Sequence, residues 1–529
     1  ADMLAGNGTS SGGKRIVHEW TFYEMTAPNR LPNGAWRGLG WDMRSGSSNR
    51  PLNMSPRAFG HGGFTGTAFW FDPATKLFVL VLSNRVYPDG KGEVNVLAGE
   101  VGEIAVHSIT DLADDADEYT RIVRREKESL EKIGGADKVK SGLDVVASLS
   151  TLSLPLSSQD LKVKRFGLIT NHTAVTLGGK SIVQVFKEIP DVKLTAIFSP
   201  EHGFTGQFDQ KNIRDSTDAD SGIPVYSLYD GNVRRPTAAM MDNVDVFVFD
   251  IQDVGTRFYT YISTMLYVME AAAMSSAASE PKEFIVLDRP NPIRGDIVEG
   301  VMLQAGKELF VGCSRLPIRH GLTAGELALL FNAQRRLRLN VSVIPCLGWE
   351  RDMDYDVTTL RWIAPSPNMR SVDAAFLYPG IGLLEFTNIS VGRGTDKPFE
   401  QIGATWIDAE RLVEALKKKA DAAQVEGVSF AACKFKPESS VYAGEECNGV
   451  SFKIENRKAL RSVRLGIVLA TTLHELYPKQ WETKNLNTLL LDEKTQRLIL
   501  DNATATEIEA AWQKDLERFM KIREQVLIY

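Results

Sequence analysis

Residues that can do chemistry follow four apolar runs of this sequence. The four runs are 166–170, 194–198, 244–249 and 284–287. The polar residues after them are, in chain order, Asn171, His172, Glu201, His202, Asp250, Gln252, Asp253, Asp288, Arg289 and Asn291. Carboxylates and imidazoles transfer protons, and all of these side chains can bind polar substrates. The sequence therefore offers one set of reactive groups, if the fold brings the ends of the four runs together.

The four runs have the features of buried parallel strands. Each is almost continuously apolar, and a proline or a polar cluster ends it. Helix-compatible stretches at 181–188 and 261–274 lie between them, which gives a β-α-β alternation. The carboxyl ends of parallel strands share one edge of the sheet, where open α/β folds bind ligands. The pattern predicts a doubly wound α/β domain with one site along that edge.

Glu201 is the candidate general acid. It follows an apolar run and Pro200. A carboxyl group that donates a proton at neutral pH needs apolar or like-charged surroundings, which raise its pKa. Asp250, Asp253 and Asp288 are its expected neighbours, and paired carboxyl groups in a cleft carry out glycoside hydrolysis. The pattern leaves open a structural role, in which Glu201 only caps the following helix.

Two other functions fit the same residues. Asp250, Asp253 and Asp288 could hold a divalent cation, as in a metal-dependent phosphohydrolase, although no glycine-rich phosphate loop accompanies them. A cleft with these groups could also bind a glycan without cleaving it. The aromatic and amide residues suited to binding a sugar are Tyr259, Tyr261, Asn291, Trp362, Asn368, Phe386 and Phe399. Aromatic residues at such positions are as often part of the hydrophobic core.

The rest of the chain separates into regions of different character. At 529 residues it is too long for one core. Residues 161–300 hold the predicted sheet, and 301–529 read as a second α/β domain with a strand at 339–344 and helices at 465–476 and 506–529. The span 349–399 is rich in Pro, Gly and Asn, so we expect an irregular binding surface there.

Composition excludes several classes of protein. The apolar fraction of 43% and charged fraction of 24% are those of a globular protein, and a net charge of −6 gives no reason to expect nucleic-acid binding. No apolar run approaches the ~20 residues of a membrane span. The four cysteines have neither metal-type nor disulfide-framework spacing. The opening Ala1-Asp2-Met3 has no initiator Met or basic leader, so we expect a piece of a longer chain.

The first 108 residues read as short strands, with one at 38–42 and a hairpin of 67–71 and 77–82. The stretch around His61-Gly62-Gly63 resembles the C-terminal part of serine β-lactamase-like hydrolases and penicillin-binding proteins. That family needs a Ser-x-x-Lys nucleophile on a helix and an upstream Tyr-x-Asn. Here Ser11 and Lys14 have the spacing but lie in a glycine-rich loop, and no Tyr-x-Asn precedes His61. We therefore expect a truncated fragment without acylating activity.

Residues 109–160 connect this fragment to the predicted sheet. The stretch 111–132 is highly charged and compatible with a helix, which favours a solvated connection. The run 143–156 could instead pack as the first helix of the next domain.

Four motifs indicate a family for residues 161–529. They are Ser199-Pro200-Glu201-His202-Gly203, the stretch 250–261, Asp288-Arg289-Pro290-Asn291-Pro292 and Gly392-Arg393-Gly394-Thr395. In this order they resemble the exo-acting β-N-acetylmuramidases of bacterial cell-wall turnover. The resemblance implies a Rossmann-like domain, a second α/β domain and a site in the cleft between them. It also implies release of N-acetylmuramic acid from the non-reducing end of peptidoglycan-derived glycans, and a periplasmic or secreted location.

The resemblance places the family's catalytic glutamate on Glu201. The other predicted catalytic residues are His202, Asp250 and Asp253, and neither a metal nor another cofactor is expected. The predicted substrate-binding residues are Asn171, His172, Gln252, Arg257, Tyr259, Asp288, Arg289, Asn291, Asn368, Arg393 and Thr395. N-acetylmuramic acid carries a lactyl carboxylate, which a cation should bind. Arg257, Arg289 and Arg393 are the candidates for that contact, unless they pair with Asp250 or Asp288.

Overall fold

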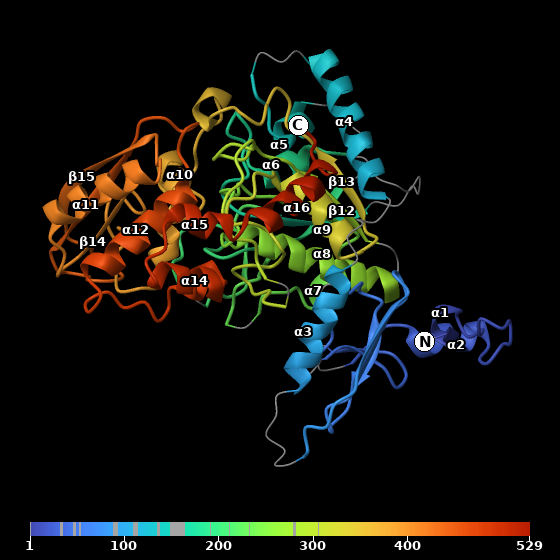
Figure 1. Cartoon of the computed structure of the whole chain (residues 1–529). Helices are drawn as coiled ribbons and strands as arrows, with labels where there is room; N and C mark the ends of the chain where they lie inside the picture. The colour runs from blue at the N-terminus through green and yellow to red at the C-terminus, as the bar shows by residue number, and fades with distance from the viewer. Residues whose placement is uncertain are drawn as a thin grey trace.

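The computed structural model describes residues 2–31, 35–45, 49–51, 54–87, 94–108, 115–134, 138–148, 164–190, 192–210, 212–231, 233–278, 282–304 and 306–529. Figure 1 shows three parts in sequence: a blue N-terminal sheet that projects from one side, a green and yellow α/β domain, and an orange and red domain on the other side. Among the described residues, no helix is both long enough and apolar enough to cross a membrane.

The N-terminal part is an antiparallel sheet. Its strands pair in chain order: β1 (Asn29–Arg30), β2 (Trp36–Arg37), β3 (Asp42–Arg44), β4 (Phe59–Gly62), β5 (Ala68–Asp72) and β6 (Leu77–Val81). Helices α1 (Asp2–Ala5), α2 (Glu19–Thr26) and α3 (Val94–His107) accompany it. The predicted hairpin is confirmed as β5 and β6. The predicted strand at 38–42 is wrong: the Gly38 N–H bonds back to the Trp41 carbonyl at 3.0 Å, which closes a turn, and β3 begins only at Asp42.

The connecting region contains two helices, α4 (Asp115–Gly134) and α5 (Gly142–Ser148). Leu143, Val145 and Val146 of α5 are at most 4% exposed, because they pack against the next domain. The alternative reading of this run as that domain's first helix is confirmed for α5, whereas the remainder of the predicted run, 149–156, lies outside the described residues.

A seven-stranded sheet forms the central domain. Its spatial order is β13 (Asn340–Ile344), β12 (Glu283–Leu287), β11 (Val246–Asp250), β7 (Lys164–Thr170), β8 (Val192–Ser199), β10 (Pro224–Ser227) and β9 (Ser216–Thr217). All neighbours pair in parallel except β9, which is antiparallel to β10. The four predicted strands are therefore parallel neighbours. The sheet also extends past residue 300, where the sequence placed a domain boundary, because β13 pairs with β12.

Helices cover both faces of this sheet because its strands are apolar on both sides. In β11, Val246 and Val248 pack with α5 and α6 (Ile182–Glu188). Phe247 and Phe249 point to the other face, into the core formed with α8 (Tyr261–Ala278) and α9 (Ala324–Gln334). The short helix α7 (Ala238–Met241) precedes β11. Both faces are thus buried, and the strand ends are the accessible part of the domain.

The third part contains a small antiparallel sheet in the order β14 (Gln401–Ala404), β16 (Cys447–Ile454) and β15 (Val428–Phe435). Its longer helices are α10 (Val372–Ile381), α11 (Ala409–Ala422) and α12 (Ser462–Leu476). The shorter elements are η1 (Tyr355–Thr358), η2 (Gly382–Leu384), α13 (Asn487–Leu490), α14 (Glu493–Leu500), α15 (Ala505–Ala510) and α16 (Gln513–Glu524).

Two predictions for this part need correction. The span 349–399 is not irregular throughout, because α10 lies inside it with Pro379 in its last turn. The predicted helix 506–529 is broken between α15 and α16, where the buried Trp512 donates from Nε1 to Thr495 Oγ1 at 2.8 Å. The chain end then returns to the central domain, next to α5 in Figure 1, where the Tyr529 hydroxyl bonds to Asp288 at 2.8 Å.

Candidate active site

A cavity of about 120 Å³ lies at the carboxyl end of β8, between the central and third parts of the chain. The central part contributes the residues that follow β8 and those that precede α8. The third part contributes the segment before α10, residues of α10 and the loops after it. The lining residues are Glu201, His202, Asp209, Phe258, Tyr259, Thr260, Val311, Ser366, Met369, Tyr378, Glu385, Phe386, Arg393, Phe399 and Leu489.

Glu201 stands at the centre of the contacts in this cavity. Its side chain is half-buried, two residues after β8 ends at Ser199. Thr260 donates from its hydroxyl to Glu201 Oε2 at 2.5 Å, and the Tyr229 phenol lies close enough to this carboxyl group to interact with it electrostatically. Burial, reinforced by the neighbouring Glu201, raises the pKa of Tyr229, so the phenol stays a proton donor. The Thr260 hydroxyl thus fixes the orientation of the carboxyl group.

The cavity lining contains a second carboxyl group, Glu385, directly after η2. Its side chain is 13% exposed and pairs with Arg393, at 2.5 Å between Oε1 and NH2. Burial raises the pKa of Glu385. The positive charge of Arg393 opposes this rise, and the negative charges of Asp209 and Glu201 add to it. Arg393 NH1 also reaches Asp209 Oδ2 at 3.4 Å. One guanidinium group therefore faces several carboxyl groups.

Aromatic rings close the cavity beside these charges. Tyr378 packs edge-on against Phe258, Tyr259 and Phe399, with ring centroids 5.1, 5.9 and 4.7 Å apart. Burial raises the pKa of Tyr259 and of Tyr378. Phe386 is 47% exposed at the rim. Rings and half-buried hydroxyls of this kind suit a ligand with an apolar face and many hydroxyl groups.

The two histidines of the predicted site differ in their accessibility to the cavity. His202 lines it in a left-handed backbone conformation, φ 69°, and its Nδ1 lies 2.7 Å from the Phe208 carbonyl. His172 Nε2 lies 2.8 Å from the Ala364 carbonyl, and burial lowers the pKa of His172. Gly206 packs on the His172 ring so closely that a Cβ there would come within 1.8 Å of it. His172 thus positions the segment after β8.

Asp250 and Arg289 form an ion pair beneath the cavity. Arg289 donates from Nε to Asp250 Oδ1 at 2.5 Å and from NH2 to Oδ2 at 3.1 Å, and both side chains are at most 8% exposed. Asp288 is also fully buried. It accepts hydrogen bonds from the Thr323 hydroxyl, the Gly325 N–H and the Tyr529 hydroxyl. These carboxylates anchor the strand ends and the chain terminus to one another.

Asp253 lies in the loop after β11 and is buried. Its Oδ2 accepts the Gly255 N–H at 2.7 Å, and its buried Oδ1 has no hydrogen-bond partner. Burial raises the pKa of Asp253 to about 7. His320 Nε2 is 3.8 Å from Oδ2, and burial lowers the pKa of His320 to about 3. Asp253 also acts electrostatically on Tyr259, so it influences the cavity through that ring.

Arg257 is fully buried and bonded to backbone carbonyls. NH1 donates to Val301 and Leu316, and NH2 donates to Leu489 and Leu490, at 2.8 to 3.1 Å. It ties the central domain to α13. Of the three arginines predicted near a substrate carboxylate, Arg257 and Arg289 are thus engaged inside the protein, and Arg393 is the one that lines the cavity.

The remaining predicted binding residues make mostly internal contacts. Asn171 accepts from Thr173, Gln252 donates to the Asp253 and Pro290 carbonyls, Asn291 donates to the Leu322 carbonyl, and Thr395 donates to the Gly392 carbonyl. Trp362 donates to the Met369 carbonyl at 3.2 Å, behind the cavity-lining Met369. Asn368 is the exception, because it donates to the cavity residue Asp209 at 3.0 Å. The structure thus brings together fewer of these residues than the motifs suggested.

The three aspartates of the phosphohydrolase alternative do not converge on one point. Asp250 faces Arg289, whereas Asp253 and Asp288 accept backbone and hydroxyl hydrogen bonds. Over the ranges that the structure describes, no group of three or more His, Cys, Asp or Glu residues could hold a metal ion. No described arrangement therefore favours this alternative.

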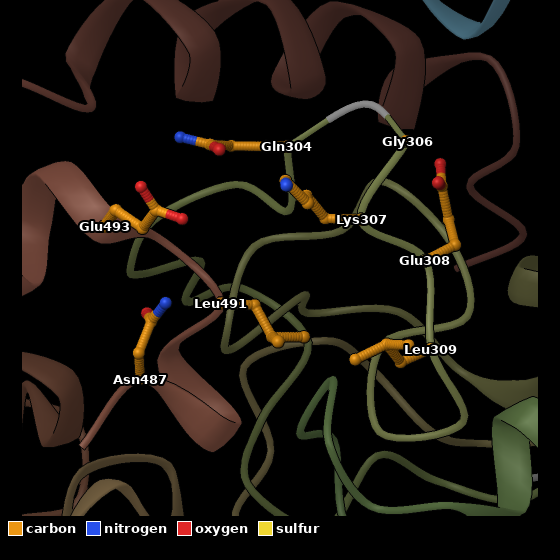
Figure 2. Close-up of a pocket in the computed structure, with 8 residues that line it drawn as sticks. All are labelled: Gln304, Gly306, Lys307, Glu308, Leu309, Asn487, Leu491 and Glu493. Atoms are coloured by element: carbon orange, nitrogen blue, oxygen red, sulfur yellow. The ribbon is translucent and has the colours of Figure 1, made fainter. Parts of the chain in front are cut away.

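A second cavity, of about 180 Å³, lies away from these carboxyl groups. Figure 2 shows its lining, with the Lys307 amine pointing toward Gln304 and with Leu309 and Leu491 on the opposite side. Lys307 also lies 3.6 Å from Glu100 of α3, so this region contacts the N-terminal sheet. It contains none of the predicted site residues.

Sequence reasoning missed several residues of the first cavity. Glu385 and Asp209 lie in loops without a preceding apolar strand, which was the signal used to find reactive residues. Thr260 was inside the motif 250–261 but was not selected, and Tyr229 follows the short strand β10. The available signal was their position after parallel strands: Thr260 lies in the loop after β11, which was predicted, and Tyr229 follows the further strand β10.

Two carboxyl groups, Glu201 and Glu385, line one aromatic-walled cavity between two α/β parts of the chain. Glycoside hydrolases use such a pair of carboxyl groups. The comparison with known families agrees. Residues 166–373 match the family described as exo-beta-N-acetylmuramidase NamZ, N-terminal, and residues 376–529 match its C-terminal counterpart. The chain therefore belongs to the exo-β-N-acetylmuramidase NamZ family.

Individual relatives are consistent with this assignment. The chain is 42% identical over 396 residues to the peptidoglycan beta-N-acetylmuramidase NamZ of Bacillus subtilis. The matched region covers 74% of this chain and 92% of that protein. Crystal structures of two DUF1343 family proteins from Bacteroides fragilis are also similar, with 34% and 30% identity and TM-scores of 0.63 and 0.57. Each match covers 74% of this chain and 99% of the solved one.

The N-terminal part has a different relationship. Residues 4–102 match the beta-lactamase family. The chain is 33% identical over 93 residues to a putative D-alanyl-D-alanine carboxypeptidase of Salmonella gallinarum, and it spans 21% of that protein's length. The β-lactamase-like resemblance is thus confirmed. Ser11 to Lys14 form an exposed turn closed by hydrogen bonds between Ser10 and Lys14.

Proposed function

We propose that this chain releases N-acetylmuramic acid from the non-reducing end of peptidoglycan-derived glycans, disaccharides or longer chains. Membership of the NamZ family and the activity named for the Bacillus subtilis relative support the substrate class. The observation that carries the proposal is the cavity itself, in which Glu201, held by the Thr260 hydroxyl, shares the lining with Glu385 and Arg393. A periplasmic or secreted location follows from this substrate.

In this proposal Glu201 is the general acid/base. It donates its proton to the glycosidic oxygen while the bond between that oxygen and the anomeric carbon breaks, so that the leaving sugar departs as a neutral alcohol. The resulting carboxylate then accepts a proton from the attacking water. Thr260 supports this role because its hydrogen bond holds the carboxyl group in one orientation.

Glu385 is the second carboxyl group that we propose for the reaction. Glycosidases of this type use a pair of carboxyl groups on either side of the scissile bond. Glu385 lines the same cavity, and its contact with Arg393 favours the ionised form that can stabilise a positively charged sugar ring. His202 lines the cavity as a binding residue, whereas Asp250 and Asp253 act from beneath it by anchoring the loop that carries Tyr259 and Thr260.

Selection of N-acetylmuramic acid rests on its lactyl carboxylate. A guanidinium group binds a carboxylate with two parallel hydrogen bonds. Arg393 lines the cavity, and its buried Nε has no hydrogen-bond partner. We assign the lactyl group to Arg393, and the sugar ring to the wall formed by Tyr259, Tyr378 and Phe399.

The strand order of the parallel sheet, which reverses between β7 and β11, supports a Rossmann-like arrangement for the supporting domain.

The test compares two chromogenic substrates that differ only in the lactyl ether. The β-N-acetylmuraminide should be hydrolysed and the matching β-N-acetylglucosaminide should be hydrolysed much more slowly. Equal turnover of both sugars would contradict the role of the lactyl group. Binding of N-acetylmuramic acid without any released sugar from natural disaccharide would favour a glycan-binding module instead.

A further inference from the structure

The carboxylate-binding position at Arg393 is already occupied by a side chain of the protein. Asp209 Oδ2 accepts a hydrogen bond from Asn368 Nδ2 at 3.0 Å and lies 3.4 Å from Arg393 NH1. Asn368 is 7% exposed, and the Arg393 side chain is 25% exposed. An amide N–H and a guanidinium group from the third part of the chain thus converge on one carboxylate oxygen from the central part.

We propose that Asp209 stands in for the substrate's lactyl carboxylate and is displaced when N-acetylmuramic acid binds. The proposal rests on the proposed function of the same site. In it, Arg393 and Asn368 form a carboxylate-binding site, and Asp209 is a specificity-determining residue because it competes with the substrate for that site.

The charges in the cavity require such a displacement. Glu385 and Asp209 supply two carboxylates even when Glu201 is protonated as the general acid, and Arg393 is the one arginine or lysine that lines the described cavity. A substrate carboxylate added to both would meet more repulsion than attraction. Removal of one internal carboxylate restores the balance. The substrate then pairs with a guanidinium group that has lost one of its two partners.

Asp209 is the carboxyl group that can leave. Its side chain is 52% exposed, whereas that of Glu385 is 13% exposed and enclosed with Arg393. Rotation of Asp209 into solvent costs little, because a half-exposed ion pair contributes little stability. Rotation of Glu385 out of its pair would leave a buried charge without a partner. Displacement therefore falls on Asp209.

The segment before Asp209 stays fixed while the side chain moves. His202 Nδ1 lies 2.7 Å from the Phe208 carbonyl, and the Phe208 N–H bonds to the His202 carbonyl at 3.3 Å. These contacts close the loop 202–208 immediately before Asp209. His202, Gly203 and Gly206 all have positive φ, which gives this loop its tight turns. Only the side chain of Asp209 and the exposed residues next to it need to change position.

The experiment measures binding of free N-acetylmuramic acid and N-acetylglucosamine by calorimetry. Asp209→Asn and Asp209→Ala should bind N-acetylmuramic acid roughly 2- to 10-fold more tightly than wild type, because a competitor for Arg393 has been weakened or removed. Affinity for N-acetylglucosamine should not change. Asp220→Asn is the matched control, since it removes a charge from an exposed residue of the same segment and should alter neither affinity.

A double variant ties the effect to Arg393. In an Arg393→Ala background, Asp209→Asn should no longer tighten binding of N-acetylmuramic acid, because the shared partner is gone. If wild type binds N-acetylmuramic acid and both Asp209 variants bind it no more tightly, the inference about Asp209 is wrong, and the proposed function is unaffected. Failure of wild type to prefer N-acetylmuramic acid over N-acetylglucosamine would overturn the proposed selectivity and, with it, this inference.

Discussion

Replacement of Arg393 by alanine should abolish discrimination between muramic acid and glucosamine substrates. Arg393 is the arginine that lines the cavity, and its partners there are Glu385 and Asp209. The loss of its guanidinium group removes the proposed partner of the lactyl carboxylate. The variant should therefore lose kcat/KM on the muraminide while the low rate on the glucosaminide changes less.

The size of the effect follows from the contact that is lost. A hydrogen bond to a charged group contributes about 1.5–3 kcal/mol. The ratio of kcat/KM values, muraminide over glucosaminide, should thus fall roughly 10- to 100-fold. Arg393→Ala also leaves Glu385 buried without its counter-ion, which destabilises the fold and the ionised carboxyl group. That second effect acts on both substrates, so the ratio isolates the lactyl contact.

A paired variant separates the two effects. Arg393→Ala combined with Glu385→Gln removes both members of the buried pair and should recover part of the lost thermal stability. Because Glu385 is itself proposed to act in the reaction, the preference of the double variant is measured by binding. Its ratio of affinities, N-acetylmuramic acid over N-acetylglucosamine, should remain low, because the guanidinium group is still absent. An Arg393→Ala enzyme that keeps the wild-type ratio would refute the assignment of the lactyl group to Arg393.

Three further predictions concern the parts of the protein around the cavity. Arg257→Met should lower the free energy of unfolding by about 3 kcal/mol or more, measured by denaturant titration, because four buried carbonyls lose their donor. Burial raises the pKa of Asp253 to about 7, so its neutral form stabilises the fold below the unfolded pKa near 4, and this contribution is lost as pH rises toward 7. The free energy of unfolding of Asp253→Asn should therefore not show that decline between pH 4 and 7. If the free energies of unfolding of wild type and variant change with pH in parallel, the raised pKa is contradicted. Hydrolysis should persist after exhaustive dialysis against chelator, and a rate restored only by added Mg²⁺ or Zn²⁺ would contradict the metal-free reaction.

The parallel strands could be predicted because their signal is local. The run 244–249 is apolar at every position except Asp245, and the structure buries both faces of it. The helix α10 was missed because Pro379 and Gly380 resemble a helix breaker. In the structure Gly380 lies against α12, where a Cβ would come within 2.0 Å of the Ser462 carbonyl. A close crossing of two helices explains the glycine, and no local pattern contains that information.

The site could be predicted only in part, because a motif does not distinguish binding residues from structural ones. Glu201 was found since it follows a strand that ends at the sheet edge. Arg257 lies inside an equally clear motif, yet the fold turns it into a buried crosslink to α13. Glu385 was missed because its relation to Glu201 arises from the packing of two domains. Such contacts between distant segments leave no periodic signal in the sequence.

The central claim is that Glu201 donates the proton to the leaving sugar, and Glu201→Gln tests it most directly. Glutamine keeps the size of the side chain and can still accept the Thr260 hydrogen bond, but its amide cannot deliver that proton. Hydrolysis of the natural disaccharide should fall at least roughly 100-fold, with a much smaller loss on a substrate whose leaving group is acidic. Turnover of the disaccharide within a few-fold of wild type would contradict the assignment.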